Sequence, residues 1–217
     1  HGIVGAQVPI GAGLAFADKY LQKKAVTFTY FGDGAANQGQ VYETYNMAML
    51  WSLPVIFVIE NNQYAMGTSV VRSTKSPSLW ERGAAYGIAG EAVDGMDVLA
   101  VKASADRAAA HCRDGHGPYI LEIVTYRYRG HSMSDPARYR SREEVQKVRS
   151  ERDPIDNIKE LILKDKHCTE EDLKKIDKKI KNVVNEAAEF SKTSPEPSPD
   201  ELFTDIYSSN RIEFNAN

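Results

Sequence analysis

The sequence predicts an α/β protein: a parallel sheet flanked by helices, with a helical C-terminal extension. Three short runs rich in β-branched and aromatic residues indicate strands, at residues 25–31, 54–60 and 118–128. Segments with the residue spacing of helices lie between them. Strands that alternate with helices are typical of a parallel sheet, and right-handed crossovers place the carboxyl ends of its strands at one edge.

The first half of the chain contains the elements on which this prediction depends. Residues 5–22 indicate a helix whose many Gly and Ala residues allow close packing against a neighbour. The first strand is followed by helical spacing over residues 39–51. The run at residues 54–60 is almost continuously apolar, which is typical of a strand covered on both faces.

The chain then continues through a predicted loop and a second crossover. Residues 61–82 are mostly polar and indicate a loop region. The segment that begins EAVDGMDVLAV leads into a helix that we expect to end near residue 113. The run at residues 118–128 completes the three predicted strands.

The composition changes after residue 140, and more than half of the charged residues lie beyond it. We therefore expect an α/β domain over residues 1–140 and a helical region with a tail over residues 141–217. Asp153-Pro154 and Thr169 are helix-start signals. Apolar residues recur every three or four positions after Thr169, which predicts an amphipathic helix.

The composition also argues against several classes of protein. The net charge is −3, whereas nucleic-acid-binding domains usually carry a basic patch. No apolar run reaches the roughly 18 residues of a membrane span. Cys112 and Cys168 lie far apart, which favours two reduced thiols over a disulfide framework or a zinc site. The chain opens HGIVGAQ, without Met, so we expect a fragment that begins inside a domain.

Two polar motifs stand at the ends of the first two predicted strands. Gly32-Asp33-Gly34 ends the first and Asn61-Asn62 ends the second, with 26 residues between Gly34 and Asn61. This spacing has room for one crossover helix and one strand. If the two strands are neighbours, Asp33 and Asn62 lie at the same edge of the sheet, where open α/β sheets bind ligands.

The residue types at this edge indicate a divalent cation beside a phosphate. Carboxylate and amide oxygens are ligands that Mg²⁺ prefers, with phosphate and water completing its octahedral shell. The N–H groups of the helix that begins near Gly39 favour an anion, and the bare backbone of the glycines lets a bulky group approach. Gly-Asp-Gly alone is common in turns, but with Asn-Asn at this spacing it matches the thiamin diphosphate motif.

Other phosphate-binding motifs do not fit the sequence. The pattern G-x-x-x-x-G-K-[ST] is absent, which excludes a P-loop. The Rossmann fingerprint requires a glycine three positions after Gly34, and Asn37 stands there instead. A nicotinamide dinucleotide is therefore a poor candidate ligand.

Five segments resemble the alpha chains of the pyruvate dehydrogenase family: GIVGAQVPIGAGLAFA, GDGAANQGQVYETYNMAMLW, ENNQYAMGTS, VDGMDVLAV and YRYRGHSMSDP. The resemblance covers residues 1–207 and implies the thiamin diphosphate-binding fold, with residues 1–140 as a diphosphate-binding domain that is incomplete at its N-terminus. It implies thiamin diphosphate and Mg²⁺ as cofactors and oxidative decarboxylation of pyruvate as the reaction. It also implies an assembly of two alpha and two beta chains that transfers acetyl groups to a lipoyl-bearing acetyltransferase component, with neither nucleic acid nor membrane as a partner.

The resemblance assigns roles to residues at the strand ends. Asp33, the side-chain oxygen of Asn62 and the backbone carbonyl of Tyr64 would bind Mg²⁺. Gly34 and Ala35 would line the diphosphate. These roles rest on the family motif and not on spacing alone.

Further roles fall outside the two motifs. Gly2 and Val4 would contact the cofactor near its pyrimidine or thiazolium end. His131 would contact the cofactor from the active-site channel as the catalytic residue, since an imidazole exchanges protons near neutral pH. Ser132 matches the serine that a dedicated kinase phosphorylates in mitochondrial members, where a phosphate would add negative charge at the channel mouth. Arg138 replaces the second regulatory serine in a loop one residue shorter than theirs, so an unregulated bacterial loop is an equal alternative.

Two other functions stay open from the sequence. The nearest is the alpha chain of a branched-chain 2-oxo acid or acetoin dehydrogenase. The other is a binding or assembly subunit that holds a nucleotide or Mg²⁺ without chemistry. The resemblance implies the cytoplasm for a bacterial protein and the mitochondrial matrix for a eukaryotic one, and the bacterial source is favoured.

Overall fold

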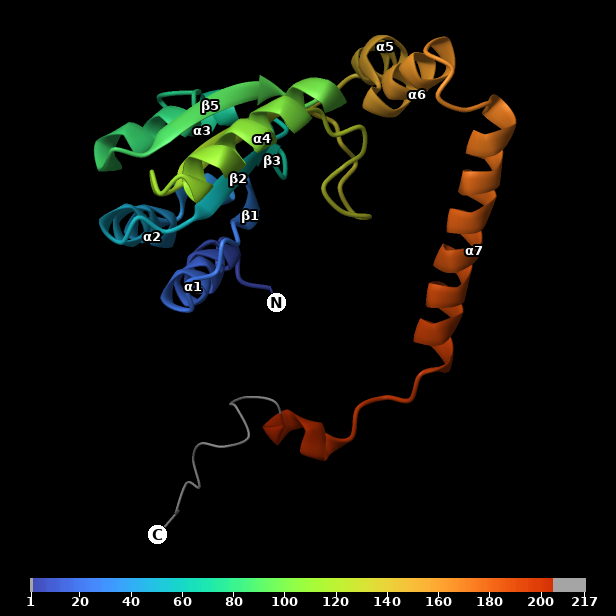
Figure 1. Ribbon diagram of the computed structural model, residues 1–217. Coiled ribbons are helices and arrows are strands. Elements are labelled where there is room, and N and C mark those ends of the chain that lie inside the picture. The colour runs from blue at the N-terminus through green and yellow to red at the C-terminus, as the bar shows by residue number, and fades with distance from the viewer. Residues whose placement is uncertain (1, 205–217) are drawn as a thin grey trace. The chain divides into compact units, whose positions relative to one another are not determined.

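The computed structural model in Figure 1 describes residues 2–204. Contacts between residues divide the chain between Glu160 and Leu161, inside helix α6 (Pro154–Lys164), and each part is described by itself. This boundary lies later than residue 140, because helix α5 (Arg142–Arg152) belongs to the first part. The predicted division into a ligand-binding domain and a helical region stays a prediction.

The first part contains a four-stranded parallel sheet with the strand order β1-β2-β6-β5. The strands are β1 (Thr27–Gly32), β2 (Val55–Asn61), β5 (Ala89–Asp94) and β6 (Tyr119–Val124). Gly32 at the end of β1 pairs with Glu60, and Asn61 at the end of β2 pairs with Val124. The carboxyl ends of β1, β2 and β6 therefore lie side by side at one edge of the sheet. The predicted α/β class with a parallel sheet is confirmed.

The sequence predicts three strands, and the structure adds a fourth, β5. This strand lies at an edge of the sheet and pairs only with β6. Its sequence, AGEAVD, has no bulky apolar run, and its residues are partly or fully exposed. Gly90 packs so closely on β6 that an added Cβ would lie 2.7 Å from the carbonyl oxygen of Ile120. A strand that depends on such a glycine has a weak signal in the sequence.

The region predicted as a loop, residues 61–82, contains short elements that the sequence does not predict. β3 (Tyr64–Ala65) and β4 (Thr68–Ser69) form an antiparallel hairpin, and the single-turn helix α3 (Val70–Ser73) follows. The 3₁₀ helix η2 (Trp80–Tyr86) begins at the end of the region. Elements of this length are too short to produce a recognisable hydrophobic period.

Helices cover both faces of the sheet (Figure 1). α1 (Gln7–Tyr20), α2 (Gly39–Leu50) and η2 pack on one face, and α4 (Val98–Arg113) packs on the other. A 3₁₀ turn, η1 (Ala35–Asn37), connects the end of β1 to α2. The predicted helices are thus present, and the polar motifs lie where strands give way to helices or turns.

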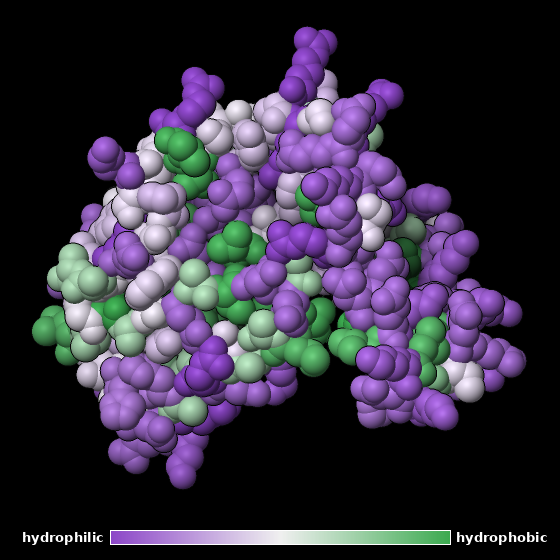
Figure 2. Space-filling model, turned by 90° about the horizontal axis from the view of Figure 1, so that it is seen from above, coloured by the Kyte–Doolittle hydropathy of each residue, from purple (hydrophilic) through white to green (hydrophobic). Residues whose placement is uncertain are grey.

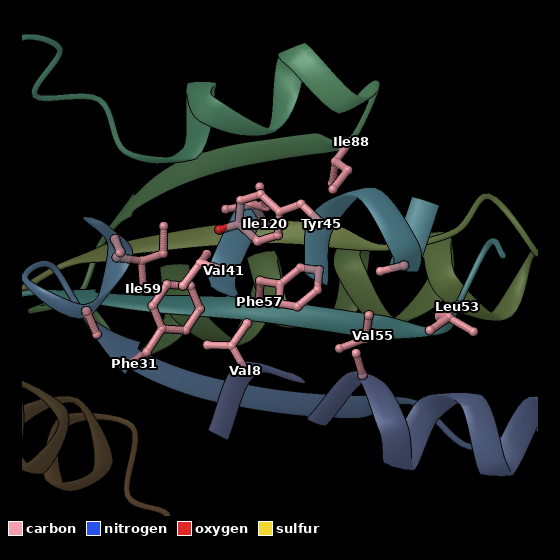
Figure 3. Packing of buried hydrophobic residues seen from close by; sticks show 14 of the residues in the cluster. Val8, Phe31, Val41, Tyr45, Leu53, Val55, Phe57, Ile59, Ile88 and Ile120 are labelled. Atoms are coloured by element: carbon pink, nitrogen blue, oxygen red, sulfur yellow. The ribbon is translucent and has the colours of Figure 1, made fainter. Parts of the chain in front are cut away.

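Apolar side chains fill both sides of β2, which confirms the prediction of a strand covered on both faces. Phe57 and Ile59 belong to the cluster under α1 and α2, whereas Ile56 and Val58 belong to the cluster under α4. Figure 3 shows Phe57 beside Tyr45, and their ring centroids lie 4.8 Å apart. Burial of each such side chain contributes roughly 1.5–3 kcal/mol, so this layer holds the ends of the strands in fixed positions.

Helix α1 approaches β1 closely through a glycine, because a Cβ added to Gly11 would lie 2.5 Å from the Cβ of Thr29. We predict that Gly11→Ala lowers the free energy of unfolding by about 1–3 kcal/mol through overpacking. Nothing lies within 4 Å of a Cβ added to Gly13 in the same helix. Gly13→Ala should therefore raise the free energy of unfolding by up to roughly 1 kcal/mol. Denaturant unfolding of both variants checks this, and equal effects at the two positions would contradict it.

The helices beyond the sheet confirm the helical C-terminal extension: α6 is followed by α7 (Glu170–Thr193) and the 3₁₀ helix η3 (Pro199–Phe203). The carboxylate of Asp153 caps α6 by accepting a hydrogen bond from its first turn. At the start of α7, the N–H of Asp172 donates to Oγ1 of Thr169, and the N–H of Thr169 donates to Asp172 Oδ2, both at 3.2 Å. Both helix starts agree with the sequence signals.

The surface is mostly hydrophilic, with separate apolar patches (Figure 2). The apolar row of α7, which includes Ile176, Ile180 and Val183, is more than half exposed. Ile10 and Leu14 on α1 are equally exposed. Both cysteines are free thiols, as predicted. Among residues 2–204, no helix has the length and hydrophobicity that crossing a membrane requires.

Candidate functional site

Asp33 and Asn62 leave neighbouring strands at the same edge of the sheet. β1 and β2 are parallel partners whose last pair joins Gly32 with Glu60. Asp33 follows Gly32 directly, and Asn62 stands two residues after Glu60. Because paired strands lie about 4.8 Å apart, the two loops begin side by side. The predicted position of the loops is confirmed, and the role of their side chains as metal ligands stays a prediction.

Asp33 is a buried carboxylate, with only 4% of the residue exposed. Burial raises the pKa of its carboxyl above the ordinary value, and its own backbone N–H, Arg127 and Arg140 act in the opposite direction. Among residues 2–204, no cationic side chain forms an ion pair with it. A buried carboxylate is destabilising unless a charge or a metal accompanies it, so the surroundings of Asp33 fit a bound cation.

The turn after β2 presents two further oxygens. Oδ1 of Asn62 accepts a hydrogen bond from the N–H of Tyr64 at 3.2 Å, and the carbonyl of Tyr64 accepts one from Arg127 at 3.2 Å. Each oxygen keeps a second lone pair. The described residues contain no group of three or more His, Cys, Asp or Glu side chains that could hold a metal. One carboxylate with an amide and a carbonyl oxygen fits Mg²⁺, which takes few protein ligands when phosphate and water supply the others.

The two glycines of the first motif have different surroundings. Nothing lies within 4 Å of a Cβ added to Gly32, so the backbone there is bare, as predicted. A Cβ added to Gly34 would lie 2.5 Å from the Cβ of Ala65. The missing side chain of Gly34 therefore makes room for the β3–β4 hairpin. A role for the Gly34 backbone beside a diphosphate stays a prediction.

An open hollow of about 440 Å³ lies beside the first described residues. Its lining consists of small and apolar residues with one glutamine: Gly2, Ile3, Val4, Gly5, Gln7, Gly32 and Ala35. Three predicted site residues, Gly2, Val4 and Ala35, thus face one space. Nε2 of Gln40 donates to the carbonyl of Val4 at 3.0 Å, which ties this segment to the first turn of α2. Contact of these residues with a cofactor stays a prediction.

An arginine that the sequence does not single out holds the turn after Asp33. Nη1 of Arg82 donates to the carbonyl of Ala36 and to Oδ1 of Asn37, both at 3.0 Å, and to the hydroxyl of Tyr42 at 2.8 Å. Arg82 lies 46 residues from Ala36 in sequence, so no local pattern marks the contact. These bonds fix η1 and the first turns of α2, and backbone N–H groups at the start of a helix favour an anion.

His131 lies in an exposed loop after β6, residues 130–141, which we call the histidine loop. Asp135 organises this loop by accepting hydrogen bonds from the N–H of His131 at 2.7 Å, the N–H of Ala137 at 2.9 Å and the hydroxyl of Tyr139 at 2.7 Å. These donors lower the pKa of Asp135 to about 2, so its carboxylate is ionised at neutral pH. Ser132 is exposed in the same loop, and its phosphorylation stays a prediction.

The histidine loop is bonded to the turn that follows β2. Arg127 donates to the carbonyl of Tyr64 at 3.2 Å, to that of Met66 at 2.9 Å and to the hydroxyl of Tyr139 at 2.6 Å. The ring of Tyr139 stacks on the ring of Tyr64, with centroids 4.7 Å apart. Hydrogen bonds and ring stacking therefore connect the loop that carries the predicted catalytic residue, His131, to the turn that carries the predicted metal ligands Asn62 and Tyr64.

Arg140 makes a second connection between the same segments, and its side chain is only 4% exposed. Nη2 donates to the carbonyl of Asn62 at 2.7 Å, and Nη1 donates to the carbonyl of Arg127. The guanidinium lies 4.0 Å from the ring centroid of Tyr126 and 4.8 Å from that of Tyr64, within the range of cation–π attraction. The sequence predicts a polar connection here, because nothing local distinguishes this arginine from its exposed neighbours.

A family model described as "Dehydrogenase E1 component" matches residues 1–200 of the chain. The chain belongs to the dehydrogenase E1 component family. The edge of the sheet and the open hollow described above therefore lie within the region that matches the dehydrogenase E1 component family.

Curated proteins similar to this E1 component chain carry matching names. The "Pyruvate dehydrogenase E1 component subunit alpha" of Rhizobium meliloti (strain 1021) is 60% identical over 206 residues, which cover 95% of this chain and 59% of that protein. The protein of the same name from Zymomonas mobilis is 57% identical over 206 residues, 95% of this chain and 58% of that protein. A potato protein (Solanum tuberosum) whose name adds "mitochondrial" is 55% identical over 208 residues, 95% of this chain and 52% of that protein. The chain thus spans between half and three fifths of the length of these relatives.

Proposed function

We propose that the chain is the cofactor-binding part of the alpha subunit of a pyruvate dehydrogenase E1 component. The observation that carries the proposal is that Asp33 and Asn62 follow neighbouring parallel strands at the same edge of the sheet. The burial of Asp33 without an ion-pair partner among residues 2–204 fits a cation. The names of relatives up to 60% identical point to the same activity.

In this proposal Asp33, Oδ1 of Asn62 and the carbonyl of Tyr64 would hold Mg²⁺, which would neutralise the charge of the diphosphate of thiamin diphosphate. The backbones of Gly34 and Ala35 lie along the diphosphate, and the start of α2 supplies N–H groups toward its negative charge. Gly2 and Val4 would contact the cofactor in the open hollow that they line with Ala35. Thiamin diphosphate, when bound, supplies the electron sink for decarboxylation of a 2-oxo acid.

His131 is the catalytic residue that this chain contributes in our proposal. Asp135 accepts a hydrogen bond from its backbone N–H, and the imidazole would exchange a proton with the substrate during acyl transfer. The partners are a beta subunit, in an assembly of two alpha and two beta chains, and a lipoyl-bearing acetyltransferase component. The relatives include bacterial proteins and a plant protein named as mitochondrial, and we favour the cytoplasm of a bacterium.

Calorimetry on the intact protein that contains this chain tests the proposal. We expect thiamin diphosphate to bind only when Mg²⁺ is present, and ATP with Mg²⁺ not to bind. Tight ATP binding without any response to thiamin diphosphate would instead favour a nucleotide-holding subunit. Steady-state rates with pyruvate, 2-oxoisovalerate and acetoin, measured with the beta subunit, then test the substrate, and a preference for either of the last two would overturn pyruvate.

A further inference from the structure

Glu122 is a buried carboxylate in the middle of the sheet that the proposed function does not use. It belongs to β6 and is 2% exposed. Oε1 accepts a hydrogen bond from Nδ2 of Asn61 at 2.7 Å, and Oε2 accepts bonds from the N–H groups of Leu79 at 2.7 Å and Trp80 at 3.1 Å. All three partners are donors, which matches the acceptor oxygens of a carboxylate.

Asn61 is also buried, with 2% exposed, and it uses both ends of its amide. Nδ2 donates to Glu122, and Oδ1 accepts a hydrogen bond from the N–H of Gln63 at 3.0 Å. Only one orientation of the amide satisfies an acceptor on one side and a donor on the other. Gln63 has a φ of 72°, in the left-handed region that a non-glycine residue rarely adopts, so the bond from Asn61 supports a conformation that is unfavourable by itself.

This turn determines where the two predicted ligand oxygens lie. Asn62 and Tyr64 flank Gln63, and Oδ1 of Asn62 accepts a hydrogen bond from the N–H of Tyr64. A change in the backbone of Gln63 therefore moves the Asn62 side chain and the Tyr64 carbonyl relative to each other. Metal sites depend on such supporting contacts, because they set the orientation of the ligands.

The same carboxylate is connected to the turn after Asp33. Its bonds to Leu79 and Trp80 hold the start of η2. Two residues further along, Arg82 donates to Ala36 and Asn37 of η1. One buried carboxylate thus supports both loops at the edge of the sheet, on one side through Asn61 and on the other through η2.

We propose that Glu122 and Asn61 are positioning residues, a buried carboxylate–amide pair that holds the Asn62–Tyr64 turn in the geometry required for metal-dependent binding of thiamin diphosphate. The inference rests on the proposed function, because it concerns the same metal ligands. It goes beyond that function in assigning the metal affinity of the edge to two side chains that touch neither metal nor cofactor.

Two single substitutions break the pair while changing little volume. Glu122→Gln leaves an oxygen for Leu79 and Trp80 but turns an NH₂ group toward the NH₂ group of Asn61, so that two donors face each other. Asn61→Asp turns a carboxylate toward the carboxylate of Glu122, so that two like charges face each other. Either change should release Gln63 from its left-handed conformation.

The double variant Asn61→Asp/Glu122→Gln exchanges the two chemical groups and restores every bond. The amide introduced at position 122 accepts from Leu79 and Trp80 through its oxygen, and its NH₂ group donates to the carboxylate introduced at position 61. The other oxygen of that carboxylate accepts from the N–H of Gln63. The net charge equals that of the unsubstituted protein, so recovery in the double variant reports on the pairing and not on charge.

The test measures three quantities in the intact protein: the Mg²⁺ concentration needed for half-maximal binding of thiamin diphosphate, the stability to denaturant, and amide hydrogen exchange at Gln63 and Tyr64 without ligand. We expect each single variant to raise the Mg²⁺ requirement at least about 10-fold and to speed exchange at both amides. The double variant should recover most of both losses. Gly11→Ala is the control, because it lowers stability through its packing on Thr29 of β1 and should leave the Mg²⁺ requirement unchanged.

The outcomes separate this inference from the proposed function. Single variants that lose stability but keep the Mg²⁺ requirement of the unsubstituted protein, as Gly11→Ala should, would overturn the inference. A double variant that binds thiamin diphosphate no better than the more weakly binding single variant would also overturn it. If a single variant does not fold, Asn61→Ser replaces it, since its hydroxyl can still accept from Gln63 while releasing Glu122. Absence of thiamin diphosphate binding in the unsubstituted protein would reject the proposed function, and with it the positioning role, while the exchange data would still report on the turn.

Discussion

Replacing Asp33 with Asn is expected to abolish Mg²⁺-dependent binding of thiamin diphosphate while leaving the sheet folded. The amide keeps the size of the side chain but removes the only carboxylate in the proposed ligand set. Loss of a supporting residue alone lowers metal affinity about 10- to 100-fold, so loss of this direct ligand should exceed that range. Calorimetric titration with Mg²⁺ and thiamin diphosphate measures the effect.

The same substitution should make the ligand-free protein more stable to denaturant. Burial raises the pKa of Asp33 in the folded state, so folding favours the neutral carboxyl, and the ligand-free protein loses stability as the pH rises from the unfolded pKa through the folded one. Asn cannot ionise, so the gain in stability should be present at neutral pH and vanish in acid below the unfolded pKa. The control for the loss of a carboxylate is Asp106→Asn, at an exposed position beside Lys102. Unchanged metal affinity in Asp33→Asn would remove the central support of the proposed function.

Replacing Arg140 with Ala is expected to have the second largest effect, because it removes one of the two connections between the histidine loop and the turn after β2. The substitution leaves the carbonyls of Asn62 and Arg127 without their donor and removes the cation between two tyrosine rings. We expect the free energy of unfolding to fall by about 2–4 kcal/mol. Faster amide exchange at His131 and Tyr64 should accompany it, with weaker cofactor binding.

Two matched variants make this prediction specific. Arg138→Ala removes an exposed arginine of the same loop and should leave both exchange and stability nearly unchanged. Arg140→Lys keeps the charge but loses the planar guanidinium that reaches two carbonyls at once. Its stability and amide exchange should therefore lie between those of Arg140→Ala and those of the unsubstituted protein. If Arg138→Ala and Arg140→Ala behaved alike, the effect would come from the charge of the loop and not from the buried contacts.

The parts of the site that the sequence predicts are those governed by regular secondary structure. Asp33 and Asn62 each follow an apolar strand, and a crossover helix of the right length separates them, so parallel pairing places both at one edge. The caps at Asp153 and Thr169 were equally predictable, because a cap depends on residues two or three positions apart.

The parts that the sequence does not predict depend on contacts between distant residues. Arg127 reaches Tyr64 across 63 positions, and Arg140 reaches Asn62 across 78. Neither arginine has a spacing that distinguishes it from solvent-exposed arginines. The strand β5 is missed for a related reason, since it is held by its pairing with β6 and not by a hydrophobic run of its own.

The close approach of Gly34 to Ala65 restricts how this protein can change over evolutionary time. The β3–β4 hairpin already occupies the volume that any side chain at position 34 would need. Growth at one of the two positions is therefore tolerable only with shrinkage at the other, and a protein with alanine at 34 should have glycine at 65. The two positions should covary among homologues even though they are 31 positions apart in the chain, and an alignment in which both grow together would show that the loops can separate.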